Sequence, residues 1–515
     1  MTNMADQTSK SAFLDLGYRA SIEQKLDQIK ELYVSDQIPW VVGYSGGKDS
    51  TAVLQLVWQA LSTMTPEERF KHVYVISTDT LVENPAVSAW VRKSLERVDA
   101  SASSQGLPIS AHCLTPEVKN TFWVNLIGKG YPAPRPKFRW CTERMKIKPV
   151  DAFIGDVVKQ NGEAILVLGT RRAESSVRSA VMKRHAKQRK REWLSPHTSL
   201  PNAFVYSPIE DWQNDDVWRF LGSDFNPWGN SNGGLLDLYQ SATEDRECPL
   251  VHDTSTQSCG SSRFGCWTCT MVDEDKSMKA MVTNDEEKAW MQPLLDFRNE
   301  LDEHDHDKRD FRRMSGHVQL FTEVGENGET RAIPGPYTQA SRADWLRKLL
   351  KAQQKVRTAK GAPKEALELE LITLPELHAI RKIWVVDKHE VEDLLPTIYL
   401  EETGTKFPTQ ELDESQPFGL TEMELLKEAC DGDSLHFELV RELLDIERQY
   451  RTMSKRANLF DRIDKAFKKG FYESADDAKE RAADRRKRKA KIASDAERMK
   501  VDREDSGDEL KEVAV

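Results

Sequence analysis

The sequence predicts an α/β protein built around a parallel sheet. Short apolar runs alternate with longer stretches whose apolar residues recur at helical spacing. The first run ends in a glycine-rich turn that opens directly into a helical stretch. Strands that alternate with helices in this way form parallel sheets covered on both faces.

The expected elements of the N-terminal part follow one another in a regular order. A helix precedes the first strand, and two strand-then-helix units come next. The expected elements are a helix at 21–34, a strand at 40–44, a helix at 51–61, a strand at 73–77, a helix at 85–97 and strands at 109–114 and 164–168.

A length of 515 residues exceeds what one compact core usually holds. After about residue 230 the sequence becomes rich in loop-forming residues, and beyond Pro334 it is helical in pattern. The last part has almost no bulky apolar side chains. We expect four parts: an α/β domain at 1–230, a loop-rich region at 231–335, a mainly helical domain at 336–470, and a charged helical or disordered tail at 471–515.

Composition limits the class of protein. No run approaches eighteen apolar residues, and the N-terminal residues lack a basic segment followed by an apolar one. We therefore expect a soluble, cytoplasmic protein. The net charge of −10 disfavours nucleic-acid binding over the whole surface, so contact with DNA would need local basic patches. The candidate patches are 183–191, the cations Arg342, Arg347, Lys348 and Lys351, and 485–491.

The glycine-rich turn is the first candidate site. Its position between a strand and a helix lets successive backbone N–H groups face an anion, and its two glycines permit close approach. Hydroxyl groups and one lysine add further donors. A pyrophosphate group fits such a nest. The residues are Ser45, Gly46, Gly47, Lys48, Asp49, Ser50 and Thr51.

Four of the seven cysteines are the second candidate site. Cys248, Cys259, Cys266 and Cys269 have the spacing C-x10-C-x6-C-x2-C among Gly, Ser and Thr residues. An odd number of cysteines argues against a disulfide framework, and such a cluster favours a reducing compartment with a metal site. Four thiolates suit zinc and an iron–sulfur cluster equally, so spacing alone leaves both open.

The loop lacks the spacing of a Walker A motif and instead resembles the SGGxDS signature of the PP-loop ATP pyrophosphatases. Downstream blocks at 139–146, 169–178, 208–212 and 216–218 are similar to the sulfonucleotide (PAPS) reductase branch. The resemblance implies an adenine nucleotide α-hydrolase-like domain that cleaves ATP between its α and β phosphates with Mg²⁺. It also implies a nucleotide site that includes Asp79, Gly169, Arg171 and Arg172.

Cys141 stands where the reductase branch has a cysteine pair. A lone cysteine is commonly structural. The other interpretation is a persulfide carrier or a residue near the nucleotide, because Arg139 and Arg144 would lower the pKa of its thiol.

Taken together, these features resemble the DndC family of DNA phosphorothioation sulfurtransferases through most of the chain, more weakly after about Pro334. The resemblance to PP-loop thiolating enzymes favours a [4Fe–4S] cluster on the four clustered cysteines, and we expect catalytic roles for Lys48, Asp49 and Cys141. The implied partners are a cysteine desulfurase of the DndA or IscS type, DndD, DndE and DNA. The alternatives are a PP-loop tRNA thiolase, a sulfonucleotide (PAPS/APS) reductase, and a regulatory sensor that binds without turnover.

Overall fold

The computed structural model describes residues 11–136, 138–189, 191–223, 225–242, 264–303, 306–322, 330–408, 419–451, 453–470 and 472–512. The chain divides into two compact units. The first comprises residues up to 122 with 133–303 and 351–371, and the second comprises 123–132, 304–350 and 372–515. The four-part division stays a prediction.

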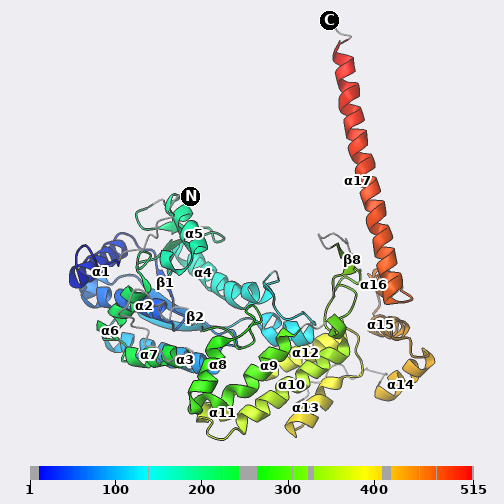
Figure 1. The fold of residues 1–515 in the computed structure, drawn as a ribbon, viewed down its shortest axis with the longest axis horizontal. Coiled ribbons are helices and arrows are strands. Elements are labelled where there is room, and N and C mark those ends of the chain that lie inside the picture. Colours follow the sequence, from blue (N-terminus) through cyan, green and yellow to red (C-terminus); the bar gives the residue numbers. More distant parts are fainter. Residues whose placement is uncertain are drawn as a thin grey trace, which may run out of the picture. The chain divides into compact units, whose positions relative to one another are not determined.

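The first unit holds all six strands of the main sheet together with the helices that cover it (Figure 1). Its strands are β1 (Trp40–Gly43), β2 (Val73–Thr78), β3 (Ile109–Leu114), β4 (Ala164–Val167), β5 (Ser195–Pro196) and β6 (Ala203–Tyr206). Its helices are α1 (Tyr18–Val34), α2 (Lys48–Ser62), α3 (Pro85–Ser104), α4 (Lys148–Asn161), α5 (Ser176–Ala186), α6 (Asn214–Ser223), α7 (Asn232–Ser241), α8 (Lys276–Asn284), α9 (Gln292–Asp302) and α11 (Lys364–Leu367).

The main sheet has the strand order β3-β2-β1-β4-β6-β5. All neighbouring strands are parallel except β5, which pairs antiparallel with β6. β1 lies between β2 and β4, with Trp40 opposite both Val73 and Ile165. The expected α/β class and its parallel sheet are confirmed. The strand order reverses at β1 and β4, which is where open α/β sheets bind ligands.

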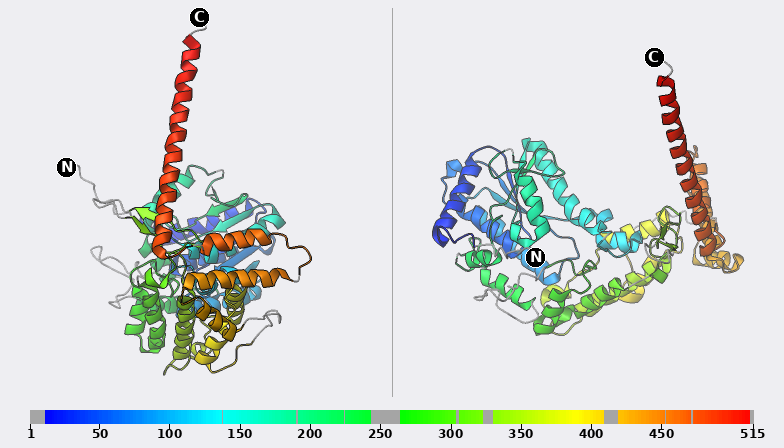
Figure 2. Two further views of the ribbon diagram at one scale, coloured as in Figure 1. Left: turned by 90° about the vertical axis from the view of Figure 1, so that its right-hand side faces the viewer. Right: turned by 45° about the horizontal axis from the view of Figure 1, so that its top comes forward.

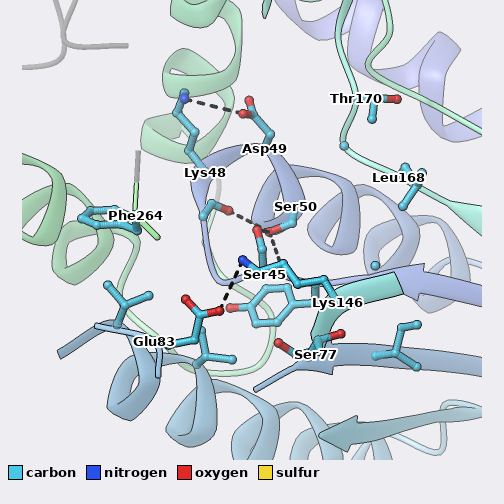
Figure 3. Close-up of a pocket in the computed structure, with 18 of the residues that line it drawn as sticks. Ser45, Lys48, Asp49, Ser50, Ser77, Glu83, Lys146, Leu168, Thr170 and Phe264 are labelled. Atoms are coloured by element: carbon cyan, nitrogen blue, oxygen red, sulfur yellow. Dashed lines mark hydrogen bonds and ion pairs between the residues drawn. The ribbon is translucent and has the colours of Figure 1, made fainter. Parts of the chain in front are cut away.

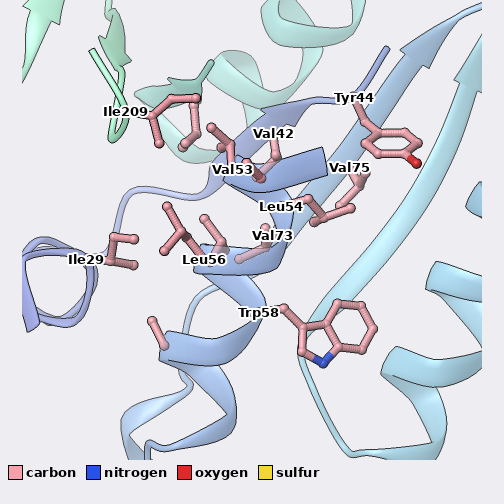
Figure 4. Close-up of a cluster of buried hydrophobic side chains, with 14 of the residues drawn as sticks. Ile29, Val42, Tyr44, Val53, Leu54, Leu56, Trp58, Val73, Val75 and Ile209 are labelled. Carbon is pink, nitrogen blue, oxygen red and sulfur yellow. The ribbon is translucent and has the colours of Figure 1, made fainter. Parts of the chain in front are cut away.

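Both faces of the sheet are buried, which explains why β1 is apolar throughout. Trp40 and Val42 belong to the large core formed with α1, α2 and α6, whereas Val41 belongs to a smaller core formed with α4. This alternation follows from the two-residue period of a strand. Figure 4 shows the larger core, where Val53 and Leu56 of α2 pack between α1 and the sheet.

Local signals place the helices that flank the site. α3 begins with Pro85 after Asn84, whose side chain accepts a hydrogen bond from the Ala86 N–H at 3.0 Å. α2 begins directly after Gly47 and has Asp49 in its first turn, where a carboxylate favours the positive end of the helix. The loop after β1 therefore runs straight into a helix N-terminus.

The second unit is mainly helical. A short antiparallel hairpin of β7 (Leu320–Thr322) and β8 (Thr330–Ala332) accompanies the helices. α10 (Gln339–Arg357) begins in this unit, and its residues from 351 belong to the first. The remaining helices are α12 (Leu374–Lys382), α13 (Leu394–Thr403), α14 (Leu420–Ala429), α15 (Ser434–Arg451), α16 (Leu459–Gly470) and α17 (Ala475–Glu512).

The C-terminal helices of this unit pack through small apolar cores. Ile446 and Tyr450 of α15 pack with Ala466 of α16. Ala478 and Ala482 of α17 pack against residues near the hairpin. Beyond these contacts α17 continues as a long straight helix (Figure 2), so the expected charged tail is helical over most of its length. Among the residues that the structure describes, no helix has the length and apolar character needed to cross a membrane.

Candidate functional site

A cavity of about 820 Å³ lies at the carboxyl ends of the parallel strands in the first unit. Its volume is in the usual range of small-molecule sites. The walls come from the loops after β1, β2 and β4, from α3 and α7, and from the π-helical turn Thr142–Ile147 that precedes α4. The cavity therefore lies at the topological switch point of the sheet.

The loop after β1 is held compact by its own hydrogen bonds. The Ser45 N–H donates to Ser50 Oγ at 3.2 Å, and Ser50 Oγ donates to the Gly47 carbonyl at 3.0 Å. Gly46 has φ +72°, and a Cβ there would lie 2.4 Å from Val91 Cγ2. Only glycine satisfies both conditions, so this backbone can bring its N–H groups close to a bound anion.

Asp49 joins two cations at the loop. Its carboxylate lies 3.5 Å from Lys48 Nζ and 2.7 Å from Arg171 Nε. Figure 3 shows the Lys48–Asp49 pair at one side of the cavity. Burial lowers the pKa of Lys48, while the charge of Asp49 acts in the opposite direction. Gly169 allows the strand end to approach this pair, because a Cβ there would lie 2.8 Å from the Asp49 carbonyl.

Tyr239 of α7 reaches the same loop from another part of the chain. Its hydroxyl oxygen accepts a hydrogen bond from the Lys48 N–H at 3.3 Å, and its ring lies 5.4 Å from Lys48 Nζ. Burial raises the pKa of this hydroxyl to about 12, so the phenol keeps its proton at neutral pH. A neutral phenol beside a phosphate nest can donate that proton in a hydrogen bond to a phosphate oxygen.

Glu83 and Lys146 connect the cavity to the cysteine segment. Both line the cavity, and Lys146 Nζ lies 3.4 Å from Glu83 Oε1 (Figure 3). Glu83 and Cys266 form an isolated antiparallel bridge, with the Trp267 N–H donating to the Val82 carbonyl at 2.9 Å. The Cys266 thiol lies 3.7 Å from Glu83 Oε1. The cavity and the Cys-x-x-Cys turn are therefore adjacent.

Three described cysteines lie close enough to influence one another electrostatically. The Cys269 N–H donates to the Cys266 carbonyl at 3.0 Å, which forms the turn of the Cys-x-x-Cys pair. The charge of Cys269 contributes to raising the pKa of both Cys266 and Cys141, in each case after burial. Cys266 in turn does most to raise the pKa of Lys146. Cys141 therefore belongs to the same neighbourhood as the clustered cysteines.

The expectation that neighbouring arginines lower the pKa of Cys141 is wrong. Burial raises the pKa of this thiol, and hydrogen bonds with Thr142 only partly oppose the rise. Cys141 immediately precedes the π-helical turn that contains Lys146. Because Lys146 lines the cavity, this turn fixes Cys141 close to the cavity wall.

The other two predicted ligands, Cys248 and Cys259, lie outside the described residues. Among the residues that are described, no group of three or more His, Cys, Asp or Glu side chains has the arrangement of a metal site. The donor set that is present fits an iron–sulfur cluster or zinc in its chemistry, because the Cys266–Cys269 turn presents two thiols and Cys141 lies nearby.

The structure brings most of the predicted nucleotide residues together. Those that line the cavity are Ser45, Gly47, Lys48, Asp49, Ser50, Asp79, Gly169 and Arg171. Gly46 in the loop and Thr51 near the start of α2 do not line the cavity. Arg172 does not line it either, and its guanidinium pairs with Glu210 at 3.0 Å. Glu83 and Tyr239 were not anticipated, because neither belongs to a motif; Lys146 closes the 139–146 block, which pointed to the family without giving this residue a role.

Comparison with known proteins agrees with this geometry. Residues 39–271 match the phosphoadenosine phosphosulfate reductase domain family. The matched segment runs from β1 to the Cys-x-x-Cys turn, so this part of the chain is similar to a PAPS reductase-like (PP-loop) domain. The chain is 24% identical over 262 residues to the uncharacterized protein MJ0066 of Methanocaldococcus jannaschii, covering 51% of this chain and 42% of that relative. It thus spans less than half the length of this curated relative.

Two solved structures show a distant likeness. One is the U34-tRNA thiolase NcsA of Methanococcus maripaludis with its [4Fe–4S] cluster, at 12% identity and a TM-score of 0.26, with 56% of this chain and 81% of that chain covered. The other is a mutant of Candida glabrata FMN adenylyltransferase, at 12% identity and a TM-score of 0.25, with 47% and 64% covered. Superpositions this loose carry no argument about the fold or the chemistry of this chain.

Proposed function

We propose that the protein is an ATP-dependent sulfurtransferase that replaces a non-bridging oxygen of a DNA backbone phosphate with sulfur. In the first step the acceptor oxygen attacks the α-phosphorus of ATP, the α–β bridging bond breaks, and pyrophosphate leaves. In the second step a sulfur nucleophile attacks the activated phosphorus, and AMP departs with the former acceptor oxygen. If the sulfur arrives as a cysteine persulfide, a second thiol must then cleave the sulfur–sulfur bond.

One observation supports this proposal above the others. The Glu83–Cys266 bridge places the Cys-x-x-Cys turn beside a cavity that already contains the glycine loop. A nucleotide held by the loop would therefore lie next to thiols. Activation of an oxygen and delivery of sulfur need these two sites to be adjacent.

Some side chains of the cavity would bind the substrates, and others would stabilise charge. The loop amides and Lys48 would hold the phosphates, and Asp49 fixes Lys48 and Arg171 in place. Lys146 lines the cavity and interacts electrostatically with Cys266, so its charge would stabilise an anionic acceptor or sulfur. Cys266 and Cys269, with Cys248 and Cys259 as the predicted remainder, would hold a [4Fe–4S] cluster. When bound, such a cluster supplies iron that can hold sulfur, and Mg²⁺ would share the phosphate charge.

The test compares nucleic acids from cells with and without the gene, and from cells with the Lys48→Ala variant. Nuclease-digested DNA is examined by mass spectrometry for sulfur-containing dinucleotides, and tRNA nucleosides from the same cells for thiolation. We expect sulfur in DNA only with the intact protein. Loss of a tRNA thionucleoside with unchanged DNA would replace DNA by tRNA as the acceptor. The cysteine desulfurase, DndD and DndE are proposed partners whose genes the test strain must contain.

A further inference from the structure

The basic patches differ in how far they are neutralised. In the 183–191 stretch Arg189 pairs with Glu210 at 3.0 Å, and Arg191 pairs with Asp36 at 2.9 Å. Arg342 of the second patch is buried and forms a bidentate ion pair with Glu390. A buried, paired guanidinium cannot meet a partner at the surface, so the expectation that this patch binds DNA through Arg342 is wrong.

The third patch, on α17, is exposed. Six of the seven residues from Arg485 to Lys491 are Lys or Arg, and none is acidic. Arg481, Arg485 and Arg488 follow one another at spacings of four and three residues, so they share one face of the helix. For Arg488 the described part of the chain offers neither an ion pair nor a hydrogen bond.

This face of α17 forms a groove with α16. The groove has a volume of about 460 Å³, and its walls are Phe467, Lys468, Tyr472, Arg481, Asp484, Arg485 and Arg488. The Arg485 guanidinium donates to the Tyr472 hydroxyl at 3.4 Å and lies 3.3 Å from His317 Nδ1. Phe467 is 42% exposed, and Phe460, seven residues before it on the same face of α16, is 83% exposed. Exposed aromatic rings beside arginines mark a binding surface.

We propose that the α16–α17 groove is a docking surface for single-stranded nucleic acid. The arginines would contact successive phosphates, and a base would stack on Phe467. Arginine grooves with aromatic platforms are the usual solution for single strands, whereas an acidic peptide needs the charge but not the rings. Asp484 is the only carboxylate among the residues that line the groove. The inference deepens the proposed function, because it assigns a surface to the nucleic acid that would contain the sulfur acceptor.

The test measures binding of the full-length protein to a fluorescently labelled single-stranded oligonucleotide, without ATP. We expect the double variant Arg485→Glu with Arg488→Glu to weaken binding at least tenfold and to reduce the salt slope by about 1.4, the value for two single-strand phosphates. The matched control, Lys479→Glu with Arg486→Glu, makes the same charge change on the other face of α17, away from the residues that line the groove. It should change affinity less than threefold. Equal losses in both variants would overturn the proposal in favour of a general charge effect.

Phe467→Ala tests the stacking contact. We expect it to weaken single-strand binding about fivefold or more and to leave binding of the matching duplex unchanged. Poly-glutamate that binds as tightly as the oligonucleotide would overturn the choice of nucleic acid. Circular dichroism confirms that each variant is folded. The binding assay contains no ATP, so an unchanged oligonucleotide affinity in the Arg485→Glu, Arg488→Glu variant would refute the docking surface alone. Absence of sulfur from DNA in the cellular test would refute the sulfurtransferase alone.

Discussion

The Tyr239 hydroxyl accepts a hydrogen bond from the Lys48 N–H, 3.3 Å away, so a residue of α7 is bonded to the first residue of α2. A phosphate in the nest would meet this hydroxyl. The phenol has no described acceptor for its own proton, and it lines the cavity. Tyr239 lies nine residues before Cys248 in the sequence, so the helix that contacts the glycine loop precedes the cysteine segment in the chain.

We predict that Tyr239→Phe raises the KM for ATP about tenfold with a smaller change in kcat, because a hydrogen bond to a charged phosphate contributes roughly 1.5–3 kcal/mol. The ring and its contact with Lys48 remain in this variant. Steady-state pyrophosphate release measures both constants. Tyr206→Phe is the matched control, since Tyr206 is also buried but does not line the cavity. An unchanged KM in Tyr239→Phe would show that the hydroxyl does not contact the nucleotide.

A second prediction separates two adjacent arginines. Arg171→Ala removes an ion pair with Asp49 inside the cavity, whereas Arg172→Ala removes a pair with Glu210 outside it. We expect Arg171→Ala to lower kcat/KM for pyrophosphate release about 100-fold or more, as loss of a charge-stabilising group does. Arg172→Ala should lower it less than threefold. A comparable loss of kcat/KM in both variants would indicate that Arg172 also belongs to the nucleotide site.

The loop itself gives the third prediction. Lys48→Ala and Asp49→Ala should each abolish α–β cleavage while the protein stays folded, because Lys48 supplies the charge and Asp49 holds it in place. The measurement is pyrophosphate release with thermal melting alongside. Undiminished pyrophosphate release in both variants would contradict the proposal that the loop binds ATP.

The sheet was predictable where strands are apolar on both faces. Residues 40–43, 73–78, 109–114 and 164–167 form β1 to β4 as expected. In β1, β2 and β4 most residues are buried, which leaves a continuous apolar run, whereas β3 is an edge strand and only partly buried. β5 and β6 were not expected. β5 has only two residues, too few to show a period. Tertiary pairing places both strands, because β6 pairs with β4 and β5 pairs with β6.

The candidate site, like the sheet, was only partly predictable from the sequence. The glycine loop was predictable because its donors are consecutive in the sequence. Glu83, Lys146 and Tyr239 reach the cavity from different elements, and each is a single residue without a spacing of its own. Only the fold brings them to the loop. The electrostatic interaction between Cys141 and Cys269 has the same origin, since the two residues are 128 positions apart in the chain.

A fourth prediction concerns pH and the second unit. Burial, with a contribution from Arg342, lowers the pKa of Lys388 from 10.5 to about 8, while Glu390 opposes the shift. Between pH 8 and 10.5 the unfolded chain binds a proton that the folded chain does not, so the free energy of unfolding rises with pH in this window. Lys388→Met should be more stable than the natural protein at pH 7, by roughly 1–3 kcal/mol. The difference should shrink as the pH approaches about 10 in melting experiments, and a constant difference would contradict the shift.

The last prediction separates activation of oxygen from delivery of sulfur. The glycine loop and the Cys-x-x-Cys turn are adjacent but consist of different residues, joined through Glu83 and Lys146. Cys266→Ser and Cys269→Ser should therefore lose the broad visible absorption of an anaerobically purified iron–sulfur protein and lose sulfur in DNA, yet keep measurable ATP cleavage. Cys248→Ser and Cys259→Ser should behave alike. Cys430→Ser, at a buried cysteine of the second unit, is the control and should keep both.

Metal binding and folding are often coupled, so circular dichroism and thermal melting must accompany each cysteine variant. Stoichiometric zinc without iron in anaerobic preparations would contradict the cluster. Cys141→Ser then decides how the third nearby thiol acts. Loss of iron in this variant would make Cys141 a ligand, as its electrostatic contact with Cys269 allows. Retained iron with lost DNA sulfur would make Cys141 the sulfur carrier, because the cluster would then be intact while transfer fails.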